Sequence, residues 1–282
     1  MRNIPELIRE FERRWKIEVG SPFVLLPNYV APALRADGTE AVIKIGTLGD
    51  KEIQTEMDAL KIYDGQGSAN LLEADPEEGV LLIERLMPGT PLSAMENDAE
   101  ATIVLATIIK KLWRSLPPDH RFPHIRDWAK GIEKYRDRTK QSGDPIPRRM
   151  IDKARELFDD LIASMQESVL VHGDLHHGNV LSAKREPWLV IDPKGVAAEP
   201  AYETAAMLQN PPDLLKRTGV NQIVERRIKI MAEQLGIEGR RILHWGIAQT
   251  VLSAVWGWED EDRQALEYGL AMAGKLLAIE LV

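Results

Sequence analysis

The chain has 282 residues, and about 150 residues per domain predicts two domains or one two-lobed unit. A composition of 44% hydrophobic and 28% charged residues is that of an ordinary globular protein, and it excludes a disordered or fibrous chain. The absence of cysteine from the sequence excludes disulfide frameworks, thiolate zinc sites, iron–sulfur clusters and cysteine nucleophiles. With 36 basic and 44 acidic residues the formal net charge is −8, which disfavours nucleic acids and anionic membranes as partners and favours a cationic small ligand.

The first 90 residues are predicted to form mainly strands, with one helix. Short apolar runs predict strands at residues 23–26, 31–35, 41–45, 71–72 and 80–83. The Asp-Gly pair at 37–38 is typical of a hairpin turn. Apolar positions at helical spacing between Asp50 and Tyr63 predict the helix. The predicted order is therefore β-β-β-α-β-β.

The rest of the chain is predicted to be mainly helical. Apolar stripes predict helices at 98–116 and 148–166, strand-like runs fall within 169–192, and helices return from about residue 203. Met87-Pro-Gly-Thr-Pro91 interrupts the chain between the two parts. The predicted division is an N-lobe at 1–86, a hinge at 87–91 and a C-lobe at 92–282.

The sequence predicts neither a membrane segment nor an export signal. Residues 1–15 are charged throughout and lack the apolar core of a signal peptide. No run approaches the ~18 apolar residues that a membrane span needs. We therefore expect a cytoplasmic protein that has no membrane or nucleic-acid partner and no obligate protein partner.

Most of the candidate catalytic and metal-binding residues lie between residues 169 and 195. An apolar strand leads into the loop His172-Gly-Asp-Leu-His-His-Gly-Asn179, and a second apolar strand ends at Asp192. Carboxylate and amide oxygens are hard donors, suited to Mg²⁺ rather than to a soft metal. Phosphoryl transfer needs such a set, because one carboxylate accepts the hydroxyl proton while other groups hold Mg²⁺ on the phosphates.

The pattern His172-x-Asp174-x4-Asn179, followed by Asp192, resembles the catalytic and metal-binding segments of protein-kinase-like folds. The sequence motif His-Gly-Asp-Leu-His-x-Gly-Asn is similar to that of aminoglycoside phosphotransferases. Three further motifs are similar to the streptomycin 6-kinase and hydroxyurea phosphotransferase subfamily, namely Ile191-Asp-Pro-Lys-Gly195, Glu199-Pro-Ala-Tyr-Glu203 and Asn210-Pro211. The resemblance runs in order from about residue 23 to residue 262.

The resemblance implies roles for five of these residues. Asp174 would be the catalytic base, and Asn179 and Asp192 would be the ligands of Mg²⁺. His172 would brace the catalytic loop, and Glu203, where the family usually has Asp, would tether it. The implied fold is α+β and bilobal, like a protein kinase, with a small antiparallel-sheet N-lobe that has one main helix and a larger, mainly helical C-lobe. The implied reaction transfers the γ-phosphoryl group of ATP to a hydroxyl.

Upstream residues match the nucleotide site that this resemblance implies. Ala41-Val-Ile-Lys44 matches the strand whose lysine pairs with the α- and β-phosphates. Glu56 is the preferred partner for Lys44, but Glu52 lies one turn earlier on the same helix face and remains a rival. The Glu84 carbonyl and the Leu86 amide would bind adenine through the backbone, so side-chain identity there is expected to matter little.

The phosphate-binding turn departs from the pattern of protein kinases. Those enzymes place G-x-G-x-x-G over the phosphates, whereas the matching turn here, Pro27-Asn-Tyr-Val-Ala31, has no glycine. We expect backbone amides or the side chain of Asn28 to contact the phosphates instead.

The acceptor site is expected in the segment from Trp245 to Asp262. Trp256 could stack on an apolar face of the ligand, while Glu259 and Asp260 pair with its amino or guanidino groups. A tryptophan at helical spacing is equally typical of a core, and an acidic run is typical of a solvated turn. The leading acceptor is a streptomycin-type aminoglycoside, and the alternative is hydroxyurea or another small metabolite.

Two other classes of protein remain possible from the sequence. Histidines 172, 176 and 177 around Asp174 offer the ligands of a His/Asp metallohydrolase. That reading leaves Lys44, Asn179 and Asp192 without a role. A nucleotide-binding module without activity is the second alternative, and every predicted catalytic position carries the expected residue type.

Overall fold

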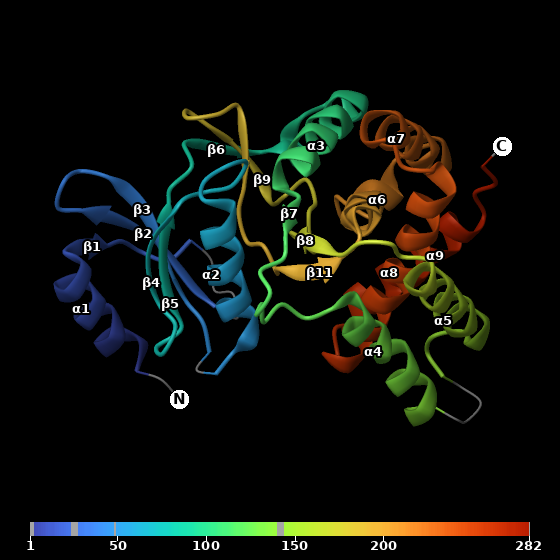
Figure 1. The fold of residues 1–282 in the computed structure, drawn as a ribbon, viewed down its shortest axis with the longest axis horizontal. Coiled ribbons are helices and arrows are strands. Elements are labelled where there is room, and N and C mark those ends of the chain that lie inside the picture. Colours follow the sequence, from blue (N-terminus) through green and yellow to red (C-terminus); the bar gives the residue numbers. More distant parts are fainter. Residues whose placement is uncertain (1–2, 24–27, 48, 140–143, 282) are drawn as a thin grey trace. The chain divides into compact units, whose positions relative to one another are not determined.

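The structure is a computed structural model that describes residues 3–23, 28–47, 49–139 and 144–281. The chain forms two compact units, Met1–Thr90 with Leu181–Gly195 and Pro91–Val180 with Val196–Val282 (Figure 1). The predicted lobe boundaries stay a prediction. The structure adds that the segment 181–195, which the prediction gave to the C-lobe, packs with the first unit. An antiparallel sheet in the first unit and a mainly helical second unit confirm the predicted α+β fold class.

The first unit is built on one five-stranded antiparallel sheet with the order β1-β2-β3-β5-β4. Its strands are β1 (Ile17–Val19), β2 (Tyr29–Arg35), β3 (Glu40–Ile45), β4 (Leu71–Asp75) and β5 (Val80–Glu84). The predicted Asp-Gly turn joins β2 to β3, with Pro32 opposite Val42 and with Gly38 at a φ of 83°. Most of the predicted strand at 23–26 lies outside the described residues.

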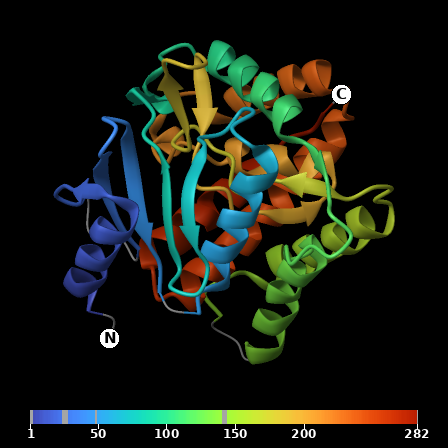
Figure 2. The same cartoon turned by 60° about the vertical axis from the view of Figure 1, so that its left-hand side comes forward.

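Two helices cover opposite faces of this sheet. Side chains alternate between faces along a strand, so Ile43 and Leu82 pack under α1 (Ile4–Trp15) together with Phe11. Leu81 and Ile83 point to the other face, where Met57 of α2 (Lys51–Tyr63) packs on them. Figure 2 shows α2 lying along the strands on this second face. Lys44 follows Ile43 on β3, so its side chain points to the α2 face.

The first 90 residues contain a helix that was not predicted, α1, in addition to the predicted helix α2. Its apolar stripe is short and lies among charged residues: Leu7 and Phe11 are buried against the sheet, while most of the other α1 side chains are exposed or half-buried. Asn3 caps the helix by accepting a hydrogen bond from the amide of Glu6 at 3.4 Å. This pattern of a cap and an i, i+4 stripe was present in the sequence and predicts a helix on its own.

Backbone pairing explains why the segment 181–195 belongs to the first unit. The amide of Ala69 donates to the carbonyl of Val190 at 2.8 Å, and the amide of Val190 donates to Gly67 at 3.0 Å. Leu189 is completely buried beside Leu86. The segment includes β10 (Trp188–Val190) and most of β9 (Val180–Ala183), which form a three-stranded sheet with β6 (Pro88–Pro91).

The second unit is mainly helical. Its longer helices are α3 (Asp98–Leu112), α4 (Ile125–Arg138), α5 (Arg148–Ala163), α7 (Val220–Leu235), α8 (Gly239–Glu259) and α9 (Arg263–Leu277). Its short helical turns are η1 (Leu92–Ala94), η2 (Pro200–Thr204), α6 (Ala205–Leu208) and η3 (Leu214–Lys216). A small sheet with the order β11-β8-β7 contains β7 (Arg114–Ser115), β8 (Val169–Val171) and β11 (Val196–Ala198).

Helix α8 forms the centre of this unit and packs against α4, α5, α6, α7 and α9. Most of its residues are buried all round, as expected for a helix inside a core. The predicted helices at 98–116 and 148–166 correspond to α3 and α5. Helix α4 was not predicted, because only Ile125, Ile132 and Tyr135 of its fourteen residues are buried and charged side chains fill much of the rest.

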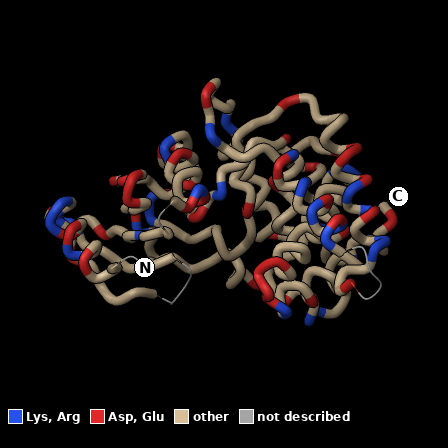
Figure 3. The backbone as a smooth tube through the Cα atoms, turned by 90° about the horizontal axis from the view of Figure 1, so that it is seen from below, with Lys and Arg blue, Asp and Glu red and all other residues tan. Residues whose placement is uncertain are grey.

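The surface carries charges of both signs. Blue and red segments are interspersed along the helices of the second unit (Figure 3). Within the described part of the chain, every helix is too short or too polar to traverse a bilayer.

Candidate active site

Three charged side chains meet in the first unit. The ammonium of Lys44 donates to Glu56 Oε2 at 2.6 Å and also to the carboxylate of Asp192. Glu56 is buried within α2, whereas the Asp192 side chain is 38% exposed. The rival carboxylate, Glu52, instead accepts a hydrogen bond from Lys194 at 3.0 Å. The structure therefore assigns Glu56, not Glu52, as the helix partner of Lys44.

Charge pairing keeps Lys44 protonated. Burial lowers the pKa of Lys44, but the facing carboxylates of Glu56 and Asp192 together raise it above its ordinary value. Complete burial raises the pKa of Glu56, and the Lys44 ammonium opposes that rise. Lys44 is therefore a fixed cation next to the partly exposed carboxylate of Asp192. The predicted roles need this arrangement, because Lys44 would bind phosphate and Asp192 would bind the metal ion.

The carboxyl end of β5 was predicted to bind adenine through its backbone. The amide of Glu84 donates to the carbonyl of Asn70 at 2.8 Å, while the next amide, of Arg85, donates to Glu40 on the other side. Leu86 lies two residues beyond the end of β5, so strand alternation does not give the direction of its amide. The adenine contacts of Glu84 and Leu86 stay a prediction.

The Glu84 side chain has a structural role that was not predicted, and the expectation that its identity matters little for adenine stays a prediction. Its carboxylate accepts hydrogen bonds from the side-chain amide of Asn70 and from the guanidinium of Arg185, both at 2.8 Å. Burial raises the pKa of Glu84, but these bonds lower it below its ordinary value overall. Arg185 also donates to the carbonyls of Gly65 and Ser68. The Glu84 side chain therefore joins β5 to two loops of the unit.

Asn28 lies at a bend immediately before β2 and is half-buried. The predicted turn at 27–31 is shorter than expected, since Tyr29, Val30 and Ala31 pair with β3 as part of β2. Pro27 lies outside the described residues. A role for Asn28 at the phosphates stays a prediction.

The second unit holds the loop that carries Asp174. Glu203 lies beneath this loop with only 1% of its surface exposed, and it accepts hydrogen bonds from the amides of His172 at 2.5 Å and Gly173 at 3.0 Å. The His172 ring is buried, and its Nδ1 accepts from the amide of Asp174 at 3.3 Å. The side-chain amide of Asn179 donates to the carbonyl of Asp174 at 3.0 Å. These bonds fix the loop from both sides.

Glu203 fits the predicted tethering position despite the change from Asp. Its longer side chain, placed on η2, accepts both loop amides with its two carboxylate oxygens. Burial raises the pKa of Glu203 to about 7, although the two amide hydrogen bonds oppose the rise. The Asp174 carboxylate raises it further, which places Asp174 and Glu203 within electrostatic reach of each other.

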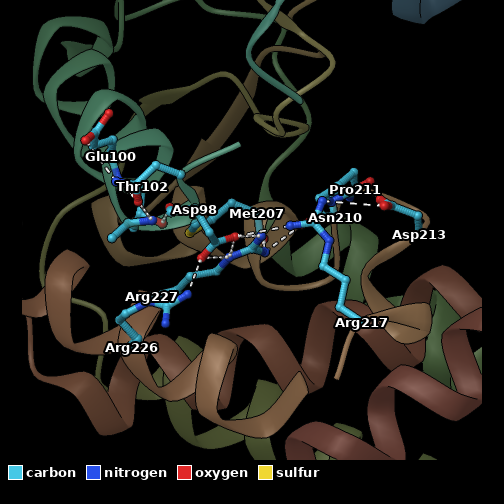
Figure 4. Close-up of polar contacts among 12 residues, drawn as sticks. Asp98, Glu100, Thr102, Met207, Asn210, Pro211, Asp213, Arg217, Arg226 and Arg227 are labelled. Atoms are coloured by element: carbon cyan, nitrogen blue, oxygen red, sulfur yellow. Dashed lines mark hydrogen bonds and ion pairs between the residues drawn. The ribbon is translucent and has the colours of Figure 1, made fainter. Parts of the chain in front are cut away.

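A second polar network lies in the same unit and was not predicted (Figure 4). Arg227 of α7 is completely buried and donates to Asp98 at the start of α3 and to the carbonyls of Met207 and Asn210, at 2.7 and 2.6 Å. Arg226 contacts the same Asp98 carboxylate from a more exposed position, at 3.2 Å. Burial raises the pKa of Asp98, but Arg227 and then Arg226 lower it overall, so the carboxylate stays charged.

This network lies close to His177 on the catalytic loop. Burial, and then the charge of Arg227, lower the pKa of His177 to about 3, so its ring is neutral. The His177 side chain is 2% exposed, and neither ring nitrogen has a hydrogen-bond partner. Asp98 and Arg227 lie 129 positions apart in the sequence, so no local pattern links them.

The predicted acceptor residue Trp256 is half-buried on α8 and belongs to an aromatic group. The Trp128 ring, from α4, packs edge-on against Trp256 at 5.3 Å between centroids and against Tyr202 at 6.1 Å. Tyr202 is buried, and burial followed by the charges of Asp174 and Glu203 raises its pKa. The aromatic group therefore extends from α8 to the neighbourhood of Asp174. Trp128 was not predicted, because helix α4, on which it lies, was not predicted.

The acidic run after Trp258 has structural partners. Glu259 forms an ion pair with Arg138 of α4 at 3.2 Å, which neutralises part of its charge. Asp260 is exposed at the end of α8, and Asp262 caps α9 by accepting from the amide of Ala265 at 3.0 Å. An acceptor role for Glu259 and Asp260 stays a prediction.

The histidines around Asp174 do not form a metal centre. Among the described residues, no group of three or more His, Asp or Glu side chains is arranged to hold an ion. The predicted assignment of Asp192 and Asn179 as ligands of Mg²⁺ stays a prediction; their oxygen donors are of the type that this ion prefers.

Comparison with known proteins identifies the class first. An aminoglycoside phosphotransferase solved in a ternary complex with ADP and hygromycin B matches with a TM-score of 0.68 at 12% identity, over 96% of this chain and 98% of that chain. The chain therefore has the protein-kinase-like fold of small-molecule phosphotransferases.

The family follows from sequence. Residues 14–261 match the aminoglycoside/hydroxyurea antibiotic resistance kinase family, and the chain belongs to it. A streptomycin 6-kinase from Streptomyces glaucescens is 32% identical, over 91% of this chain and 84% of the relative. A hydroxyurea phosphotransferase from Kitasatospora aureofaciens is 33% identical, over 97% of this chain and 79% of the relative. These findings confirm the family resemblance and the kinase class.

Proposed function

We propose that this kinase transfers the γ-phosphoryl group of ATP to a hydroxyl of a small cationic acceptor in the cytoplasm. The observation that carries the proposal is the bonding of Lys44 to both Glu56 and Asp192. A buried lysine held by a helix carboxylate and a partly exposed aspartate is the arrangement that phosphoryl-transfer enzymes use for nucleotide phosphates. The ADP complex of the structural neighbour supports a nucleotide cofactor.

The proposal gives each predicted residue one task. Lys44 binds phosphate oxygens, with Glu56 holding its ammonium in place, and Glu84 and Leu86 bind adenine through the backbone. Asp192 and Asn179 would hold Mg²⁺, which when bound supplies positive charge on the phosphates. Asp174 accepts the proton of the acceptor hydroxyl, while Glu203 and His172 keep the loop of Asp174 fixed.

The proposed acceptor is a streptomycin-type aminoglycoside. The similarity to a streptomycin 6-kinase supports it, as does the aromatic group of Trp128 and Trp256, whose half-buried indoles suit stacking on a sugar face or guanidinium. Asp260 is an exposed carboxylate that can pair with a cationic group, and Glu259 is less available because Arg138 occupies it. Antibiotic resistance is then the consequence of acceptor phosphorylation.

A second candidate acceptor is hydroxyurea. It is favoured by the similarity to a hydroxyurea phosphotransferase, which is as high as the similarity to the streptomycin kinase. Hydroxyurea is neutral and small, so stacking and charge pairing would contribute little to its binding.

A kinase assay across aminoglycosides, hydroxyurea and small metabolites tests the proposal. We expect ADP release that depends on an aminoglycoside and on Mg²⁺, and that falls by ~10²–10⁴ in Asp174→Asn. Acceptor-independent hydrolysis alone, or equal turnover by Asp174→Asn, would contradict it. Turnover with hydroxyurea and not with aminoglycosides would select the second acceptor.

A further inference from the structure

The loop that follows β10 is bonded to one face of α2. The hydroxyl of Thr55 donates to the carbonyl of Lys194 at 2.7 Å, and the Lys194 ammonium donates to Glu52 at 3.0 Å. Glu52 and Thr55 are three residues apart on α2, so their side chains share a face. The carbonyl of Glu52 lies 3.0 Å from the same hydroxyl, which has a single proton, so the shorter contact, to Lys194, is the stronger of the two.

The same loop includes Asp192, and the same helix face includes Glu56. Glu56 follows Thr55 directly and holds Lys44, whose ammonium contacts the Asp192 carboxylate. Helix α2 therefore contacts the loop directly at Lys194, through Thr55 and Glu52, and indirectly at Asp192, through the Lys44 ammonium that Glu56 holds. These contacts help to set the position of the Asp192 carboxylate.

Asp192 adopts a backbone conformation that needs such support. Its φ is 61°, in the left-handed region that residues other than glycine seldom occupy. Residues in this region persist where the surrounding contacts determine the conformation, and they cluster at functional sites. The hydrogen bond from Thr55 to the carbonyl of Lys194, two residues after Asp192, is one contact that restrains this segment without using the Asp192 side chain.

The two contacts of Lys194 differ in strength. The pair between Lys194 and Glu52 joins side chains that are 32% and 69% exposed, and exposed ion pairs contribute little. Thr55 is buried, and losing one partner of a buried hydrogen bond leaves the other polar group without compensation. Of these two contacts, the hydrogen bond from the Thr55 hydroxyl is therefore the one expected to hold the loop more strongly.

We propose that Thr55 is a positioning residue for Asp192, and that it acts through the Lys194 carbonyl to hold the Asp192 carboxylate where a divalent cation on the nucleotide can be bound. The inference rests on the proposed function, because it takes Asp192 as a ligand of Mg²⁺. It assigns a second task to α2 besides holding Lys44.

The test is nucleotide affinity with and without the metal. In Thr55→Val the side chain keeps its shape but loses the hydroxyl. Calorimetric titration should show Mg·ATP binding weakened about three- to tenfold, the range expected for one lost hydrogen bond. Binding of metal-free ATP should stay within twofold of wild type, because Asp192 acts through the cation. Thr55→Ser keeps the hydroxyl and should bind Mg·ATP like wild type.

Two controls separate positioning from general damage. Thr102→Val makes the same change at a buried threonine of α3, whose hydroxyl bonds only within its helix, to the carbonyl of Asp98 at 2.7 Å. It should leave both affinities unchanged. Glu52→Gln removes the exposed partner of Lys194 and should weaken Mg·ATP binding by less than twofold. Equal weakening of metal-free ATP and Mg·ATP in Thr55→Val, or no weakening at all, overturns the proposal.

Hydrogen exchange tests the positioning role of Thr55 even if the chain binds no nucleotide. A wild type that binds neither Mg·ATP nor ATP would refute the proposed function but would leave the loop contact open to measurement. In Thr55→Val, amides of residues 191–196 should exchange at least threefold faster than in wild type, with Thr55→Ser unchanged. Exchange at 191–196 that is equal in Thr55→Val and wild type overturns the positioning role by itself.

Discussion

Replacing Arg227 by methionine should destabilise the second unit strongly. The substitution keeps most of the length and apolar stem of the side chain but removes a guanidinium that is completely buried. Asp98 then loses its buried partner, and the carbonyls of Met207 and Asn210 lose their donor. Breaking a buried ion pair by removing one partner costs about 3–5 kcal/mol. We take about 3 kcal/mol, because Arg226 still contacts Asp98 at 3.2 Å.

Arg226→Met is the matched control. It makes the same chemical change at the neighbouring position and removes a contact to the same carboxylate, but its side chain is 48% exposed. An exposed ion pair contributes about 0–1 kcal/mol. Urea denaturation followed by circular dichroism should therefore give a much lower midpoint for Arg227→Met and a nearly unchanged midpoint for Arg226→Met.

The second comparison is a double-mutant cycle with Asp98→Asn. If Arg227 and Asp98 stabilise the unit through each other, the double variant should be less destabilised than the sum of the two single variants by at least about 1 kcal/mol. A loss below 1 kcal/mol in Arg227→Met, or additive losses in the cycle, would show that the buried network does not hold α3, α7 and the segment at 207–210 together.

Three other predictions follow from the site. Asp192→Ala should abolish binding of Mg·ATP in a thermal-shift titration, whereas Asp174→Asn should keep it and lose ~10²–10⁴ in kcat; the reverse pattern would exchange their roles. Because burial raises the pKa of Glu203 to about 7 from 4.5, the folded state binds more protons between these values, and the stability from this group is present at low pH and lost as pH rises through 7. In wild type, this group should lower the free energy of unfolding by up to about 3 kcal/mol between pH 4.5 and 7, and Glu203→Gln should not show this fall. The measurement is the difference in free energy of unfolding between the two proteins. The contribution of His177, whose titration has the opposite sign, cancels in that difference. Trp128→Ala should raise KM for an aminoglycoside at every salt concentration, while salt alone should raise KM in wild type; an unchanged KM in both series contradicts a cationic, stacked acceptor.

Several features of the fold followed from local sequence patterns. The strands at 41–45 and 80–83 were predicted because they are short, apolar and bounded by turn residues, and α3 and α5 because their apolar stripes are long. Helices α1 and α4 were missed because charged residues outnumber their few buried positions, so the stripe of each one is narrow. The packing of the segment 181–195 with the first unit did not follow from local patterns, because its pairing partners, Gly67 and Ala69, lie more than 100 residues away.

The catalytic loop was predictable because its residues are contiguous and their spacing is set by one turn. The choice between Glu52 and Glu56 was not, since both lie on one helix face and only the tertiary partners, Lys194 and Lys44, distinguish them. The same limit applies to Trp128, whose ring neighbours, Tyr202 and Trp256, come from two other elements of the chain.

The central claim is that Asp174 directs the γ-phosphoryl group of ATP to an acceptor hydroxyl. The most direct measurement is mass spectrometry of the acceptor after incubation with ATP, Mg²⁺ and enzyme, using streptomycin first and hydroxyurea second. We expect a mass gain of one phosphoryl group with wild type and a rate lower by ~10²–10⁴ with Asp174→Asn. Phosphorylation at the same rate by both enzymes, or unmodified acceptors with a wild type that binds Mg·ATP, would contradict it.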